Sequence, residues 1–173
     1  MKIFDRYIPQ FVYGSFDGIV TTYAVIAAAA ASGMSSTVVV IFGLANLFAD
    51  GFSMGSSAFL SHQAEHKKTK KLDKKYTPLR LSIATFLSFL VVGFMPVLPY
   101  FVDIFMDLKI SGQQLFMISS ALTCFMFILV GYAKSVHQKR ALWSSMTETF
   151  LLGVIAAGLA YFVGAVLKDV FGS

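Results

Sequence analysis

The sequence predicts an all-α integral membrane protein with five transmembrane helices in each protomer. Three observations lead to this fold class. Apolar residues make up 57% of the 173 residues and charged residues only 13%, whereas soluble domains are about 45–50% apolar and about 25% charged. The mean hydropathy is +0.73. The apolar residues are also gathered in long stretches, so a lipid bilayer is expected to surround much of the surface.

Five segments are long enough to span a bilayer, because a spanning helix needs about 20 mostly apolar residues. They cover approximately residues 10–32, 37–61, 79–102, 112–133 and 147–168. Gly33 and the serines after it mark a tight turn before the second segment. Pro96 and Pro99 lie near the end of the third, where a helix stops or kinks. We therefore expect one transmembrane domain over 1–173, with a basic linker at about 62–78.

The basic residues predict the orientation of these helices. Of the 14 Lys and Arg residues, 12 fall before the first segment, around the linker or in the loop after the fourth segment. Cytoplasmic loops carry an excess of Lys and Arg, so we expect the N-terminus in the cytoplasm and the C-terminus on the other side. The basic linker has a single aromatic residue, Tyr76, and no nucleic-acid-binding motif, which argues against a nucleic-acid partner. An odd number of spans argues against a simple inverted repeat within the chain, so we expect any two-fold symmetry to come from a homodimer.

Two acidic residues lie inside the predicted spans, Asp17 in the first and Asp50 in the second. A central Asp costs about 2.5–3.5 kcal/mol on insertion scales, and such a residue is by default a candidate functional group. The structural alternatives are a hydrogen bond between helices or a misplaced boundary of the predicted span. The spacing favours function, because each acid belongs to a polar or small-residue stripe on one helical face. The stripes contain Gly14, Asp17, Thr21, Ala24 and Ala28 in the first span, and Asn46, Asp50, Ser53, Met54, Ser57 and Ser61 in the second.

The depth of these residues follows from the helical rise. Asp17 and Met54 each lie about seven residues, or roughly 10 Å, from the cytoplasmic end of their span, so we expect them to lie level. Asp50 is then one turn deeper and Asn46 two turns deeper. Carboxylate and amide oxygens with one thioether suit a divalent transition metal such as Fe²⁺ or Mn²⁺. We expect such an ion as a transported substrate, with no tightly bound cofactor.

An acid in a low-dielectric site tends to keep its proton, and a metal must displace that proton to bind. One residue can therefore carry either ion, which is what a metal/proton exchanger requires. His62, Glu65 and His66 lie where the second span leaves the membrane, and the two histidines could hold a metal at a cytoplasmic entrance. The alternative there is a solvated helix end. No nucleophile–His–acid constellation and no phosphate-binding glycine loop occur in the sequence, so an enzyme is not expected.

Two motifs on the first two spans resemble the vacuolar iron transporter family. They are Phe16-Asp17-Gly18-Ile19-Val20-Thr21-Thr22 and Gly43-Leu44-Ala45-Asn46-Leu47-Phe48-Ala49-Asp50-Gly51-Phe52-Ser53-Met54-Gly55. The likeness continues through Gly131-Tyr132-Ala133-Lys134 and covers nearly the whole chain. Members of this family move Fe²⁺ and Mn²⁺ out of the cytosol, into vacuoles in plants and fungi. The resemblance implies a five-helix protomer, a two-fold dimer with the ion path between protomers, and metal/proton antiport, and Asp17 and Met54 match the family's membrane metal ligands.

The sequence departs from the plant members of the family in two places. Asn46 stands where those proteins carry a Glu. An amide cannot release a proton, so the proton stoichiometry stays open and Asp50, one turn away, is the candidate to carry that charge. Plant members also insert a Glu-rich metal-collecting domain where this chain has only the lysine-rich linker. These departures favour a prokaryotic plasma membrane, with a vacuolar-type membrane as the expectation for a eukaryotic host.

Two other functions are consistent with the sequence. A proton-coupled carrier of another small solute would need a larger polar cavity than a stripe of small, oxygen-bearing side chains offers. A non-transporting membrane subunit would use its acids only to pair helices, and it would be insensitive to Asp17→Asn.

Overall fold

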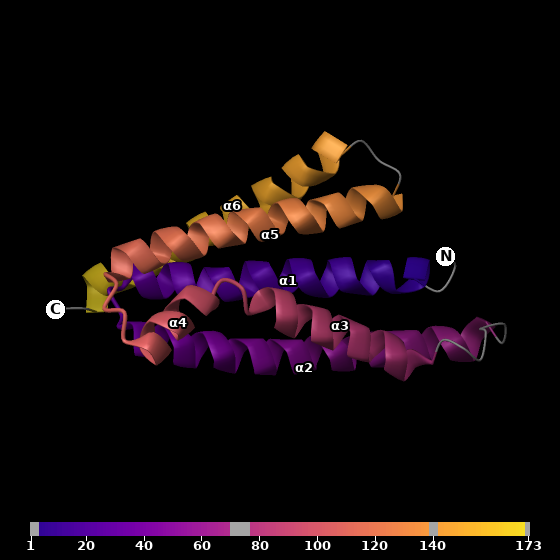
Figure 1. Ribbon diagram of the computed structural model, residues 1–173. Helices are drawn as coiled ribbons and strands as arrows, with labels where there is room; N and C mark the ends of the chain where they lie inside the picture. The colour runs from indigo at the N-terminus through magenta and orange to yellow at the C-terminus, as the bar shows by residue number, and fades with distance from the viewer. Residues whose placement is uncertain (1–3, 70–76, 139–141, 172–173) are drawn as a thin grey trace.

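The computed structural model describes residues 4–69, 77–138 and 142–171, and these residues are almost entirely helical. Their six helices are α1 (Phe4–Ala31), α2 (Ser36–Thr69), α3 (Pro78–Gly93), α4 (Leu98–Met106), α5 (Gly112–Gln138) and α6 (Leu142–Phe171). α1 lies in the middle of the bundle, with α2 and α3 on one side and α5 and α6 on the other (Figure 1). We call the end where α1 begins and α2 ends the linker end, and the opposite end, where α1 ends and α2 begins, the turn end.

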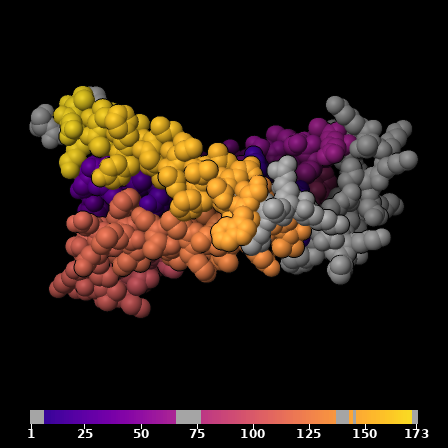
Figure 2. Space-filling view, turned by 90° about the horizontal axis from the view of Figure 1, so that it is seen from above, coloured from indigo at the N-terminus to yellow at the C-terminus, as the bar shows by residue number. Residues whose placement is uncertain are grey.

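Four of the described helices are long and apolar enough to cross a membrane, and a fifth crossing results if α3 and α4 form one broken span. The four stretches are Tyr7–Ala31, Ser36–Glu65, Gly112–Val136 and Met146–Val170. Their apolar side chains largely face outwards: only 11% of the α6 stretch is buried inside the protein. α6 covers the outside of the bundle along α1 and α5 (Figure 2). The chain is therefore an all-helical, multi-pass membrane protein, as the composition predicts.

The third predicted span is broken rather than continuous. The axes of α3 and α4 differ by 58°. Pro96 and Pro99 lack the N–H groups that would continue the helical ladder, and a turn bond of 3.0 Å from the Val97 N–H to the Phe94 carbonyl closes the gap. Ser119 of α5 donates a hydrogen bond of 2.7 Å to the Pro96 carbonyl. The break is thus held in place by a neighbouring helix.

The second helix is longer than its predicted span. α2 continues to Thr69, whereas the basic linker is expected from about residue 62. The Gln, Ala, Glu and Lys residues between 63 and 68 have high helix propensity, and no Gly or Pro interrupts them. The last apolar residue therefore does not mark the end of the helix, and the linker begins later than expected. Its residues 70–76 lie outside the described part of the chain.

Short backbone motifs close the helices at the turn end. Gly33 follows α1 with a positive φ of 72°, and the N–H groups of Gly33 and Met34 bond back to carbonyls in the last turn of α1. This is the Schellman pattern, in which glycine avoids the strain of a left-handed conformation. Ser111 and Gln114 form a capping box at the start of α5, because each side chain accepts a bond from the other's backbone N–H.

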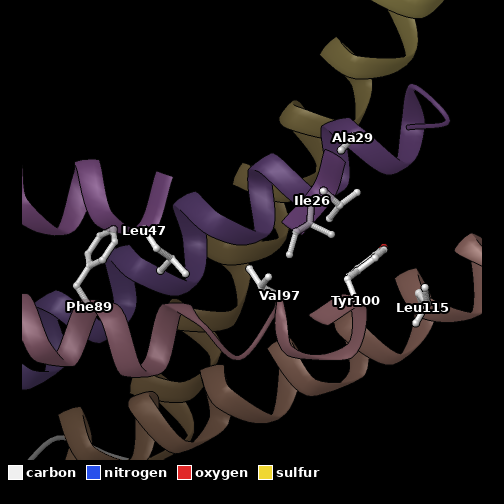
Figure 3. Close-up of a cluster of buried hydrophobic side chains, with 8 residues drawn as sticks. Ile26, Ala29, Leu47, Phe89, Val97, Tyr100 and Leu115 are labelled. Atoms are coloured by element: carbon white, nitrogen blue, oxygen red, sulfur yellow. The ribbon is translucent and has the colours of Figure 1, made fainter. Parts of the chain in front are cut away.

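The largest buried cluster fills the corner that the helix break creates (Figure 3). Val97 and Tyr100, from the break and α4, lie in this cluster with Ile26 of α1, Leu47 of α2 and Phe89 of α3, and each is at most 3% exposed. A second cluster joins α1 to α3 and α5. Together the two clusters hold α1 against its neighbours, and this packing sets its height relative to α2.

Candidate metal site on the first two helices

α3 sets the heights of α1 and α2 against each other. Gly18 of α1 and Gly51 of α2 both pack on Phe89: a Cβ at Gly18 would lie 2.6 Å from the Phe89 carbonyl oxygen, and one at Gly51 would lie 3.2 Å from the Phe89 ring. Asp17 and Asp50 immediately precede these glycines, so the two acids lie on adjacent helices within about one helical turn of each other along the bundle. We call the region that holds them the acid layer. Both residues are half-buried, and their carboxyl groups are near enough to interact electrostatically.

Met54 lies about 5 Å, one helical turn, nearer the linker end than the acid layer. Its neighbour Gly55 packs on Ser82 and Phe86, which precede Phe89 along α3. This differs from the prediction from the sequence, in which Met54 lies level with Asp17 and Asp50 lies one turn deeper. The reason is that the predicted depth was counted from the end of the apolar stretch, whereas α2 continues past that point and meets α1 at a different height.

Asn46 continues the stripe of α2 one turn beyond the acid layer, toward the turn end. The residue is half-buried, and its Nδ2 has no hydrogen-bond partner among the described residues. A buried amide group without an internal partner costs free energy unless water or a ligand meets it. With Asp17, Asp50 and Met54, Asn46 forms a set of oxygen-bearing side chains and one thioether that extends along about two turns of α2.

The polar stripe of α2 borders an uncovered side of the bundle. Ser53 and Ser57 are exposed, and Phe48 and Phe52 beside them are 61% and 71% exposed. In the part of the chain that the structure describes, no three His, Cys, Asp or Glu side chains gather in a metal-binding group. One copy therefore offers two carboxylates, one amide and one thioether, and the site is open on one side.

A pocket of about 430 Å³ opens between α1, α2 and α3, on the linker side of Met54. His62 lines this pocket, and its Nε2 lies 3.4 Å from Nε2 of Gln10 on α1. On the other side of the ring, His62 Nδ1 lies 3.8 Å from the Glu65 carboxylate. Two of the three residues predicted at an entrance are thus neighbours at this pocket. The third, His66, has its side chain outside the described residues.

Gln10 and Tyr13 line the same pocket, although the sequence pattern did not single them out. A signal existed for Gln10, which precedes Gly14 by four residues and Asp17 by seven and so extends the stripe of α1 by one turn. Gln10 is also the first residue of the first predicted span, however, and a polar residue is expected where a span begins. Tyr13 carries no comparable signal, because aromatic residues are common near membrane interfaces.

Half-buried acids on two adjacent membrane helices, open to one side, are typical of proteins that carry ions across membranes. Comparison with known families defines the class more closely. The model of the VIT family matches residues 8–75 and 65–165. The chain belongs to the VIT family, which confirms the resemblance to the vacuolar iron transporters.

Curated relatives match a shorter part of the chain. A vacuolar iron transporter of Toxoplasma gondii is 41% identical over 59 residues, which make up 34% of this chain and 20% of that protein. A vacuolar iron transporter of Plasmodium falciparum is 39% identical over 54 residues, 31% of this chain and 20% of that protein. The counterpart in Plasmodium berghei is 34% identical over 59 residues, 34% of this chain and 22% of that protein. The chain thus spans about a fifth of the length of these relatives.

Proposed function

We propose that the protein carries Fe²⁺ or Mn²⁺ across its membrane, out of the cytosol and in exchange for protons. The observation that carries the proposal is the acid layer, in which Asp17 and Asp50 lie close together on adjacent membrane helices. Acidic residues inside membrane spans are costly and mark ion and proton pathways. Membership of a family whose named relatives are vacuolar iron transporters supports a metal ion as the cargo.

The donor set supports a divalent transition metal. Carboxylates bind divalent cations in general, whereas the thioether of Met54 favours ions softer than Mg²⁺ or Ca²⁺. A cation that binds Asp17 or Asp50 displaces any proton on that carboxyl group. The same two groups can therefore carry metal in one direction and protons in the other. Asn46 cannot exchange a proton, so in this proposal Asp50 carries the charge at this part of the path.

The distribution of basic residues supports the direction of transport. The start of α1, the end of α2, the start of α3 and the end of α5 lie at the linker end (Figure 1). Of the 14 Lys and Arg residues, 12 fall in the sequence at or beside these helix ends, within 2–6, 67–80 and 134–140. Because cytoplasmic loops carry the excess of Lys and Arg, we assign the linker end to the cytosol. The pocket beside His62 then opens toward the cytosol, and the path leads from there past the acid layer.

A second copy of the chain would close the uncovered side of the site. A two-fold dimer with α1 and α2 around its axis would cover Ser53 and Ser57 and double the carboxylates of the acid layer. With the native thiol removed by Cys124→Ala, we expect Ser53→Cys to form a disulfide between copies on mild oxidation in the membrane. Leu159→Cys, on the exposed face of α6, is the control and should stay monomeric on denaturing gels. Cross-linking through Leu159→Cys but not through Ser53→Cys would contradict this dimer.

Uptake of Mn²⁺ into proteoliposomes tests the transport proposal. Asp50→Asn should lower the initial rate by about tenfold or more, because the loss of a ligand costs at least as much as the loss of its outer partner. Asp169→Asn makes the same change on an exposed acid of α6 and should leave the rate unchanged. No uptake by either protein would favour a non-transporting subunit, and equal uptake by the native protein and Asp50→Asn would mean that the metal follows a path without Asp50. Proton movement without Mn²⁺ uptake would favour a carrier of another solute.

A further inference from the structure

The pocket at the linker end is lined by residues other than the two acids of the acid layer. Its polar and sulfur-bearing side chains are Gln10, Tyr13, Met54, Ser57, Ser61, His62 and Thr85. No Asp, Glu, Lys or Arg belongs to this lining in the described part of the chain. Met54 lies between the two regions, since it lines the pocket and lies one turn from the acid layer. The pocket is therefore a neutral compartment that adjoins the acid layer.

The imidazole of His62 is held from both sides. Gln10 Nε2 lies 3.4 Å from His62 Nε2, and the Glu65 carboxylate lies 3.8 Å from His62 Nδ1. A carboxylate beside Nδ1 favours the tautomer with its proton on that atom, which leaves the Nε2 lone pair free for a metal. The side chain of Glu65 is 70% exposed and that of His62 only 25%. Nδ1 therefore faces the more exposed Glu65, whereas Nε2 faces Gln10, which lines the pocket.

The amide of Gln10 is placed to share a metal with His62. Gln10 Oε1 is buried and has no hydrogen-bond partner among the described residues. A half-turn of the amide would exchange its nitrogen and oxygen and bring Oε1 to face His62 Nε2. Two ligands about 2.1 Å from one ion lie about 3.0 Å apart at a right angle and about 3.4 Å apart at the tetrahedral angle. The separation of 3.4 Å between Gln10 and His62 therefore suits two ligands of one transition metal.

We propose that Gln10 and His62 form a separate binding station, at which a divalent transition metal binds before it reaches Asp17 and Asp50. The Ser61 hydroxyl lines the same pocket next to His62 in the chain, so it can add a third neutral donor. That the bound ion is also the transported one rests on the proposed function, whereas binding at the station does not.

The chemistry of this station selects between cations. Mg²⁺ and Ca²⁺ take carboxylate, carbonyl and water oxygens, whereas imidazole nitrogen suits transition metals. Because the lining has no carboxylate, Mg²⁺ gains little from leaving its water shell, and a transition metal gains the nitrogen of His62. Neutral ligands also hold the ion less strongly than carboxylates do, so the ion can move on to the acid layer.

Pulsed EPR of Mn²⁺ bound to the purified full chain tests the station directly, because an imidazole ligand adds a nitrogen modulation to the Mn²⁺ echo. We expect this modulation in the native protein and in Asp17→Asn, and its loss in His62→Gln. His137→Gln is the matched control and should keep it. Modulation that persists in His62→Gln would overturn the station, and so would its absence from a native protein that still binds Mn²⁺.

Competition by Mg²⁺ tests the role of Gln10. Gln10→Glu would put a carboxylate into the pocket, and the Mg²⁺ concentration that halves Mn²⁺ binding should fall by about tenfold or more. Gln63→Glu makes the same change on an exposed part of α2, and equal competition in both variants would overturn the role of Gln10. Mn²⁺ flux through the same proteins separates the two proposals. Native flux without nitrogen modulation overturns the station alone, and modulation without flux overturns transport alone.

Discussion

Gly18→Ala should destabilise the protein by forcing α1 away from α3. A Cβ at this position would lie 2.6 Å from the backbone carbonyl oxygen of Phe89. Close carbon–oxygen contacts are about 3.3–3.6 Å, so the two helices would have to separate by roughly 0.7–1.0 Å. Because the atom in the way belongs to the backbone, no side-chain rotation relieves the contact.

Three contributions set the size of this effect, of which two destabilise the variant and one stabilises it. Forcing an extra methyl group into a well-packed interface costs about 1–3 kcal/mol. A gap of about 0.5–1 Å also removes a quarter to a half of each dispersion contact along the interface. Alanine favours the helix over glycine by about 1 kcal/mol, which acts in the other direction. We expect the free energy of unfolding to fall by about 1–2 kcal/mol.

Equilibrium unfolding in mixed micelles, with SDS as the denaturant, measures this change. Gly158→Ala is the matched control, because a Cβ there meets no atom within 4 Å. It should leave the unfolding midpoint unchanged or raise it slightly, through helix propensity alone. Equal midpoints for Gly18→Ala and Gly158→Ala would refute the reasoning that close backbone contact at Gly18 sets the position of α1 on α3.

Two further predictions concern contacts between helices. Ser119→Ala removes the 2.7 Å bond to the Pro96 carbonyl and should lower the free energy of unfolding by about 1 kcal/mol; an equal loss in the exposed Ser144→Ala would contradict the role of that bond. Lys134 and Glu148 pair at 2.9 Å between α5 and α6, and Glu148 is 48% exposed. A double-mutant cycle should therefore give a coupling of only about 0.2–1 kcal/mol that shrinks in high salt, and a larger, salt-independent coupling would show the pair to be better shielded than its exposure indicates.

The membrane helices could be predicted from the sequence because length and apolar character are properties of consecutive residues. The C-terminal end of α2 could not, because residues 62–69 extend the helix beyond the apolar stretch through helix propensity. Pro96 and Pro99 predicted that the third span would stop or kink. The break also depends on α5, because Ser119 donates a hydrogen bond to the Pro96 carbonyl. Contacts between segments that are distant in the chain leave no local trace in the sequence.

The candidate site likewise combines features that single residues reveal with features that depend on contacts between distant segments. Asp17 and Asp50 could be identified because a carboxylate inside an apolar stretch is itself informative. Their common layer could not, because it depends on how Phe89 packs on the glycines of both helices. The proximity of Gln10 to His62 could not be predicted either, because it depends on α2 continuing past residue 61 and placing His62 beside α1.

The central claim is that metal ions cross the membrane past Asp17 in exchange for protons. Mn²⁺ flux and internal pH, recorded together in proteoliposomes of the native protein and Asp17→Asn, test it most directly. We expect Mn²⁺ movement with opposite proton movement in the native protein, and the loss of both in the variant. Equal Mn²⁺ flux in the two proteins, or Mn²⁺ flux without proton movement, would contradict the claim.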